Sequence, residues 1–321
     1  MNWLRLPSPR TALALLAGAL WAFAFPLFEI QLLAWLAPGL LLLTGMGVNP
    51  RTALRLGWLA GLVHHLIALY WLLHIPFAFG NVAGWLALSA YCALFPALWL
   101  WLCVHLRPGI PPGNTQKAGE QSTRFLPRTD PYAVGAAPVK LRGETWDALR
   151  ALIDAGWYRR HAWLLFAAAA WVGLEFLRGW FLSGFPWNFL GASQFKLIPL
   201  IQLASVTGVH GVSFLVVWVS VSLAAGAAVV LLRPQLRFAW KNEVALALIT
   251  LLLVVSWGMG RATKPPATAT ADRTMKLALV QPSIPQTLIF DPEAATNRFN
   301  QLLALTRQAL AARPDVVIWP E

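Results

Sequence analysis

Long apolar runs separated by short polar breaks fill most of the chain up to about residue 260. Several runs reach the roughly 20 apolar residues that a helix needs to cross a bilayer. We count seven, at residues 11–27, 30–47, 54–75, 82–106, 161–182, 209–232 and 243–260. An open sheet would leave backbone groups unpaired in lipid, so we interpret the runs as helices. The pattern predicts a polytopic α-helical membrane domain over residues 1–262, with about seven spans.

A polar insertion at residues 107–160 separates the fourth run from the fifth. It begins with closely spaced prolines and glycines between Arg107 and Gly113, which are typical of a loop. A short helix is predicted near Thr145–Tyr158. The insertion contains no catalytic constellation, and we expect it to be cytoplasmic.

The pattern changes after residue 262. Residues 263–274 are rich in Thr, Pro and Ala and form a predicted linker, of the kind that separates domains. Met275–Val280 and Asp315–Trp319 have the short, β-branched or apolar pattern of strands. Between them, Asp291-Pro292-Glu293 is a helix start signal. Residues 299, 302, 303, 306 and 310 then fall on one helical face.

Strand, helix and strand in this order predict a parallel, right-handed β-α-β unit over residues 275–321. A parallel sheet needs cover on both faces, and one helix cannot supply it. We therefore expect this unit to be unstable unless other protein supports it.

Composition and charge agree with a membrane domain and add an orientation. The chain is 58% hydrophobic and 12% charged, whereas soluble domains have about 25% charged residues. If the N-terminus is cytoplasmic, most cations fall on the inner side, where positive residues are favoured. These are Arg5, Arg10, Arg51, Arg55, Arg107, Lys117, Arg124, Arg128, Lys140, Arg142, Arg150, Arg159, Arg160, Arg233, Arg237 and Lys241. Only Arg178 and Lys196 lie in the outer loops between spans.

An odd number of crossings then places the residues after about 260 on the outer side. The net charge of +12 is explained mainly by this topology. The basic residues are scattered and carry no nucleic-acid-binding motif, so we expect no nucleic-acid partner.

Residues 1–24 also have the pattern of a signal peptide: Arg5 and Arg10, an apolar core, and Ala22-Phe23-Ala24. Phe25-Pro26 and the next apolar run follow directly. These features favour an uncleaved first helix.

Few polar side chains lie inside the apolar runs. Cys92 and Cys103 are predicted to be buried small residues without a disulfide. His64 and His65 have no further ligands at metal-binding spacing, so we expect no metal site. Glu175 and Arg178 are three residues apart on one helix face. Intramembrane charges are expensive and usually paired, which favours a structural ion pair over a headgroup contact at the outer surface.

Two segments resemble a known family. Glu175–Trp187, continuing to Gly191-Ala192-Ser193-Gln194, resembles the fifth-helix region of bacterial apolipoprotein N-acyltransferases. Leu279–Gln286, Asp291-Pro292 and Ile318–Glu321 resemble the opening of that family's nitrilase-like (CN hydrolase) domain, an α-β-β-α sandwich. Seven helices before such a domain also match the family's order.

The resemblance implies a reaction at the bacterial inner membrane, with the nitrilase-like segment in the periplasm. A cysteine takes an acyl chain from a phospholipid, and the resulting thioester acylates the α-amine of a diacylglyceryl-modified lipoprotein. This is the last step of lipoprotein maturation and needs no cofactor. Glu321 matches the general base. The partner lysine and the nucleophilic cysteine have no match in the chain, which resembles an N-terminal portion that we expect to be inactive alone.

Two aromatic residues match or replace substrate-contacting positions of the family. Trp187 matches an aromatic residue near the mouth of the active site, although an interfacial tryptophan without such a role explains it equally well. Phe290 stands where the family has tryptophan before Asp-Pro. It supplies a flat apolar surface but lacks the indole N–H.

Two other functions remain open. A membrane-tethered nitrilase-type amidase would use the same glutamate on soluble substrates, but the Glu175–Trp187 segment argues against it. A non-catalytic membrane protein, such as a transporter or scaffold, is compatible with seven spans. Few intramembrane charges and no evident repeat of helix groups argue against a transporter.

Overall fold

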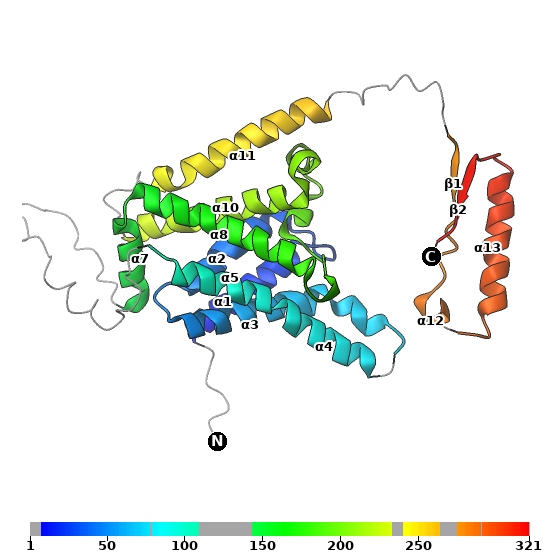
Figure 1. The fold of residues 1–321 in the computed structure, drawn as a ribbon, viewed down its shortest axis with the longest axis horizontal. Helices are drawn as coiled ribbons and strands as arrows, with labels where there is room; N and C mark the ends of the chain where they lie inside the picture. Colours follow the sequence, from blue (N-terminus) through cyan, green and yellow to red (C-terminus); the bar gives the residue numbers. More distant parts are fainter. Residues whose placement is uncertain are drawn as a thin grey trace, which may run out of the picture. The chain divides into compact units, whose positions relative to one another are not determined.

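The computed structural model describes residues 8–77, 79–108, 143–232, 240–263, 275–289 and 291–320. The chain divides into two units, one of residues 1–69 and 86–263, the other of residues 70–85 and 264–321. The larger unit is a helical bundle (Figure 1). Its elements are α1 Pro9–Phe23, η1 Gln31–Trp35, α2 Ala37–Thr44, α3 Pro50–Ala68, α5 Leu94–His105, α7 Glu144–Asp154, α8 Trp157–Arg178, η3 Phe181–Ser183, η4 Leu190–Gln194, α9 Ile198–Ile201, α10 Ala204–Leu232 and α11 Trp240–Ala262. The element η2 Tyr70–His74 belongs to the smaller unit, and α4 Gly80–Cys92 leads into α5.

Within the described residues, three helical segments are long and apolar enough to cross a membrane. They are Gly80–His105, Ala204–Leu232 and Trp240–Ala262, and two shorter apolar segments are Pro9–Phe23 and Gln31–Thr44. Each of the seven predicted runs coincides with helical structure. The prediction of a mostly helical membrane domain is therefore confirmed, while the number of spans stays a prediction.

Helix starts follow local capping chemistry. Asn49 caps α3, where its side chain accepts a hydrogen bond of 2.8 Å from the Thr52 N–H, and Pro50 occupies the first helical position. Ser8 caps α1 in the same way through the Thr11 N–H at 3.2 Å. The short helix predicted near residues 145–158 is present as α7, and Gly156 at φ +83° separates it from α8.

Two helices end earlier than their apolar runs. The run at 54–75 is helical only to Ala68 and continues as the 3₁₀ turn η2, and the run at 161–182 ends as a helix at Arg178. The helices end before the runs because apolar side chains continue past the last helical turn, into segments that bend out of the helix.

Small residues allow helices to approach closely, as is typical of membrane bundles. A Cβ added to Gly18 of α1 would lie 2.2 Å from the carbonyl oxygen of Ala60 in α3. A Cβ on Gly39 of α2 would lie 2.4 Å from the carbonyl oxygen of Ser220 in α10. The Gly39 N–H also donates to the Ser220 hydroxyl at 2.9 Å. These contacts bring α1 against α3 and α2 against α10.

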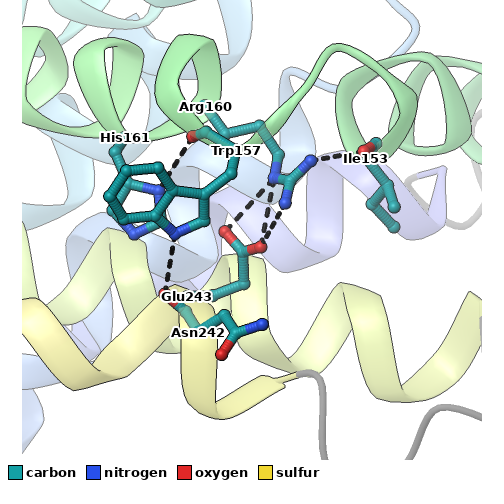
Figure 2. A network of polar contacts seen from close by, with 6 residues as sticks. All are labelled: Ile153, Trp157, Arg160, His161, Asn242 and Glu243. Carbon is teal, nitrogen blue, oxygen red and sulfur yellow. Dashed lines mark hydrogen bonds and ion pairs between the residues drawn. The ribbon is translucent and has the colours of Figure 1, made fainter.

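A partly buried polar network joins the first turns of α8 and α11 (Figure 2). The Arg160 guanidinium donates to both oxygens of Glu243, with the shortest distance at 2.6 Å, and also to the Ile153 carbonyl. The Trp157 indole donates to the Asn242 carbonyl at 3.4 Å. The Glu243 side chain is only 2% exposed, so this ion pair is held inside the protein.

The smaller unit contains the predicted strand, helix and strand. Strands β1 Leu277–Leu279 and β2 Val316–Ile318 pair in parallel, with Ala278 opposite Val317. The connection contains the short helix α12 Gln286–Ile289 and the long helix α13 Ala295–Leu310, which lies on one side of the strand pair (Figure 1).

The helix predicted from Asp291-Pro292-Glu293 begins later than expected, at Ala295. The Asp291 carboxylate accepts the Glu293 N–H at 2.9 Å, and this bond closes a turn before the helix. Asp291 therefore stabilises a local turn instead of capping the helix, and Ala294 occupies the cap position.

Candidate functional site

Of the three predicted site residues, the structure describes only Trp187. Glu321 and Phe290 lie outside the described residues. Trp187 lies between η3 and η4, in the segment that follows α8; we call residues 179–190, which include η3 and the first residue of η4, the Trp187 loop. The structure therefore describes one part of the candidate site, at the end of α8.

The Trp187 loop has an unusual backbone. Leu182, Ser183 and Asn188 have positive φ angles of 52°, 75° and 51°. Residues other than glycine rarely adopt this left-handed backbone conformation, so the surrounding contacts must hold the loop in place. Gly184, at φ +80°, is required by its surroundings, because a Cβ there would lie 2.0 Å from the Gly179 carbonyl oxygen.

Trp187 is partly exposed, at 41%. Its ring stacks on that of Phe185, with centroids 6.2 Å apart and planes at 27°, and the backbone N–H of Trp187 donates to the Phe185 carbonyl at 2.9 Å. The neighbouring Trp180, Phe181 and Leu182 are also exposed. The loop thus presents aromatic and aliphatic surface, which suits contact with lipid.

Glu175 binds the end of this loop from inside the bundle. Its Oε1 accepts two hydrogen bonds, from the Trp171 indole at 2.9 Å and from the Leu190 N–H at 2.7 Å. Its Oε2 lies 3.9 Å from Nδ1 of His210 on α10. The residue is 5% exposed, so a carboxylate inside the bundle is bound directly to the backbone at the end of the loop.

Arg178, the other charge predicted on this helix face, has different partners. Its guanidinium donates to Nε2 of His65 at 2.9 Å and lies over the Phe189 ring, 5.3 Å from the centroid. Nδ1 of His65 lies 2.8 Å from the Gly61 carbonyl, to which it must donate, so Nε2 is free to accept from the arginine. The Arg178 carbonyl accepts the Phe185 N–H at 2.8 Å.

The prediction that Glu175 and Arg178 pair with each other is wrong, because each has other hydrogen-bond partners. Both residues are buried, which excludes a contact with headgroups at the surface, and each bonds to other groups instead of to its neighbour. Spacing on the helix placed them on one side of α8, but the tertiary partners came from α3, α8 itself and the loop.

A second set of polar contacts holds the segment after the loop. Ser213 of α10 accepts the Gly191 N–H at 2.8 Å. Gln194 accepts from the Trp35 indole at 2.9 Å and donates to the Gln31 carbonyl at 3.1 Å. The Gly191–Gln194 segment was singled out by its resemblance, but these contacts were missed, since Ser213, Trp35 and Gln31 lie far away in the sequence.

A pocket adjoins the two charged residues. It has about 280 Å³ of empty space, part of which is open to the outside. Its lining is Trp21, Phe95, Pro96, Trp99, Trp171, Leu174, Glu175 and Arg178. His64, which is fully buried, stacks on Trp21 with ring centroids 3.6 Å apart. The wall is therefore aromatic, with charge at one side.

The described residues do not bring a nucleophile to a base. Cys92 and Cys103 are free and buried in α4 and α5. Lys276 lies at the amino end of the strand pair, where its N–H donates to Asp315 at 2.7 Å and its Nζ donates to the Ala312 carbonyl at 2.5 Å. It therefore faces away from the carboxyl end of β2, after which Glu321 follows.

No cluster of three or more His, Cys, Asp or Glu that could hold a metal occurs in the part of the chain that the structure describes. The arrangement can hold a strained, aromatic loop at the end of α8.

Comparison with known proteins identifies the family. The family model described as "Apolipoprotein N-acyltransferase N-terminal domain" matches residues 17–116 and 141–222, more than half of the chain. An apolipoprotein N-acyltransferase of Geobacter metallireducens is 31% identical over 324 residues, covering 96% of this chain and 50% of the relative. One of Azotobacter vinelandii is 34% identical over 331 residues, covering 100% and 52%. The chain thus spans about half the length of these curated relatives. We conclude that the chain belongs to the apolipoprotein N-acyltransferase family, and that it matches the N-terminal portion of its members.

Proposed function

We propose that this chain is the N-terminal portion of an enzyme that transfers an acyl chain from a phospholipid to the α-amine of diacylglyceryl-modified lipoproteins. The observation that carries the proposal is the match to apolipoprotein N-acyltransferases along the whole chain, at 31% and 34% identity to two relatives. The family model also covers α8 and the Trp187 loop. The enzyme would act in the bacterial inner membrane, where both substrates are anchored.

The proposed chemistry has two steps. The Glu321 carboxylate takes the proton of a cysteine thiol, and the thiolate attacks the ester carbonyl of the phospholipid. A lysine stabilises the tetrahedral oxyanion, and the lyso-phospholipid leaves as an alcohol after it takes the proton back from Glu321. The lipoprotein amine then attacks the thioester and gives its proton to Glu321, and the thiolate leaves and is reprotonated, which gives an amide.

The lysine and the cysteine in this scheme come from sequence other than these 321 residues. The buried positions of Cys92 and Cys103 and the orientation of Lys276 support this part of the proposal. Residues 275–321 would then be the first strand, helix and strand of the nitrilase-like domain, which their parallel pairing supports.

The membrane arrangement is part of the proposal. Seven spans, a cytoplasmic N-terminus, a cytoplasmic 107–160 insertion and a periplasmic nitrilase-like segment follow from the apolar runs and the placement of the basic residues. The seven helical segments that coincide with the runs support the count. Cysteines introduced singly at Ser8 and at Thr263 test the topology: a membrane-impermeant thiol reagent added to spheroplasts should label only the second.

Trp187 and Phe290 are proposed to contact the lipid portion of the substrates. The exposure of Trp187 and of the adjoining apolar side chains supports its role. For Phe290, the support is its place before Asp291-Pro292, where the family has an aromatic residue.

A transfer assay tests the proposal. The complete gene product is reconstituted in vesicles that contain phosphatidylethanolamine with a labelled acyl chain, together with a synthetic diacylglyceryl lipopeptide. We expect label to appear in an amide at the lipopeptide N-terminus, and to disappear with the Glu321→Gln variant. Hydrolysis of small soluble amides without any transfer would instead establish the amidase alternative. Vesicles in which neither reaction occurs would overturn an enzymatic role.

A further inference from the structure

We propose that Glu175 is a positioning residue, which fixes the Trp187 loop by binding its backbone from inside the bundle. This role concerns the geometry of the loop, and its effect on acyl transfer rests on the proposed function. The substrate contact in the proposed function is that of Trp187, and Glu175 acts on it through the backbone of the loop.

The first step of the argument is the bond between the carboxylate and the loop. Oε1 of Glu175 accepts the Leu190 N–H at 2.7 Å, in a site where the glutamate is 5% exposed. A hydrogen bond from a backbone N–H to a buried carboxylate is short and strong, since the charge is poorly screened there. Loss of the acceptor would leave the Leu190 N–H unpaired inside the protein.

The second step is the place of Trp187 between two anchors. One anchor is the Leu190 N–H on Glu175, and the other is the Phe185 N–H on the Arg178 carbonyl at 2.8 Å. Both acceptors belong to the last turn of α8. Trp187 lies two residues after Phe185 and three before Leu190, so the loop has little freedom while both bonds persist.

The third step is the backbone of the loop. Leu182, Ser183 and Asn188 are held at positive φ, which an unrestrained chain would leave. The anchor at Leu190 is two residues from Asn188, so its removal frees the nearest of these positions. We therefore expect the loop to relax, and Trp187 to move, when Glu175 can no longer accept.

The orientation of the carboxylate also depends on its own helix. The Trp171 indole, one helical turn earlier on α8, donates to the same Oε1 at 2.9 Å. His210 lies 3.9 Å from the other oxygen. These neighbours limit the rotation of the side chain, and this makes Glu175 a fixed support instead of a mobile one.

The test uses fluorine NMR on the 321-residue chain in nanodiscs, with 5-fluorotryptophan at its 18 tryptophans. The Trp187 signal is assigned by its loss in Trp187→Phe. In Glu175→Ala, we expect the Trp187 signal to shift and narrow toward that of a mobile side chain. The Trp171 signal should shift as well, since its partner is removed, and the Trp163 signal should not, since its indole bonds to the Cys103 carbonyl.

Glu243→Ala is the matched control, because it removes another buried carboxylate. Glu243 lies in α11 and pairs with Arg160 in the first turn of α8, at the opposite end of that helix from the Trp187 loop. It should shift the Trp157 signal, whose indole bonds to the Asn242 carbonyl, and leave the Trp187 signal unchanged. Glu175→Gln keeps an acceptor oxygen and should restore most of the native Trp187 signal. An unchanged Trp187 signal in folded Glu175→Ala would overturn the proposal.

If Glu175→Ala does not assemble, Glu175→Asp replaces it. The shorter side chain keeps the charge but withdraws the acceptor from Leu190, so the Trp187 signal should still shift, and an unchanged signal again contradicts the proposal.

Kinetics on the complete gene product connect the loop to the reaction. Glu175→Ala should raise the KM for phospholipid on the order of tenfold with a smaller change in kcat, since it misplaces a binding group, and Glu175→Gln should recover most of this loss. A shifted Trp187 signal without transfer by the wild type would leave the positioning role intact and contradict the proposed function. Transfer by the wild type with an unshifted Trp187 signal would do the opposite.

Discussion

At the scale of single residues, the bundle keeps its charges by surrounding each with several partners. Arg160 and Glu243 share bidentate contacts, while Glu175 and Arg178 bond to neutral donors and acceptors instead of to each other. Burial makes each of these groups expensive to leave alone. The consequences of removing one partner should therefore be much larger than those of removing a surface charge.

Glu243→Ala tests this expectation. The variant leaves the Arg160 guanidinium buried without its carboxylate, which should cost about 3–5 kcal/mol of stability. Unfolding in detergent, followed by circular dichroism against SDS fraction, measures the difference. Asp147→Ala is the control, because its pair with Arg150 is exposed and should be worth no more than about 1 kcal/mol. Equal effects of the two variants would contradict the importance of burial.

Trp187 offers a second prediction at this scale. If it contacts lipid substrate, Trp187→Ala should lower kcat/KM of the complete enzyme on the order of tenfold, about 1.4 kcal/mol, while Trp187→Phe should retain most of the activity. Trp257→Ala is the control, because Trp257 of α11 is equally exposed, at 41%, but lies outside the Trp187 loop. An interfacial role without substrate contact would make Trp187→Ala behave like this control.

At the scale of elements, close approach between helices sets the packing of the bundle. Gly18 of α1 contacts the Ala60 backbone of α3, whereas Gly173 of α8 has nothing within 4 Å of where its Cβ would be. Both are helical glycines, but only the first lies at a helix crossing. Their replacement by alanine should thus have opposite effects.

Gly18→Ala should push α1 away from α3 and cost about 1–3 kcal/mol, as overpacking does. Gly173→Ala should be neutral or stabilise by up to about 1 kcal/mol, because alanine is the better helix former. The same detergent unfolding measurement compares the two. Stabilisation by both variants to the same degree would show that helix propensity, not packing, decides.

The elements also show how far sequence reasoning reaches. Apolar runs predicted where helices lie, because burial in lipid demands them. A short helix in the polar insertion and a parallel pair of short, apolar or β-branched strands were predicted as well, and are present as α7 and as β1 with β2. The apolar runs did not predict that α8 stops at Arg178, since Trp180, Phe181 and Leu182 remain apolar after the helix ends. The partners of Glu175 and Arg178 were equally out of reach. Spacing along one helix cannot reveal a backbone N–H or a histidine that the fold brings from elsewhere.

At the scale of the whole molecule, one face of the strand pair in the smaller unit is exposed among the described residues. Leu277, Leu279, Val316 and Ile318 are all exposed there, at 39% or more, while Ala278 and Val317 on the other face are half-buried. Aliphatic side chains of a parallel sheet normally lie beneath a helical layer. Only one face of this strand pair is therefore packed against other residues of the unit.

A peptide of residues 275–321 should be unfolded in water. One covered face and two short strands cannot offset the conformational entropy of ordering 47 residues. Far-ultraviolet circular dichroism should show a disordered spectrum, with helix appearing only in trifluoroethanol. A cooperative thermal transition in buffer would show that the unit folds without further protein.

The contact between Arg160 and Glu243 spans 83 residues of sequence, and this separation has a consequence during synthesis. At a translation rate of about 5–20 residues per second, roughly 4–17 s pass between the emergence of the arginine and that of its carboxylate. Over that interval the newly made α8 presents an uncompensated cation to its surroundings. Other groups must compensate this charge until α11 is made, so biogenesis of the bundle depends on the order in which the ribosome delivers its parts.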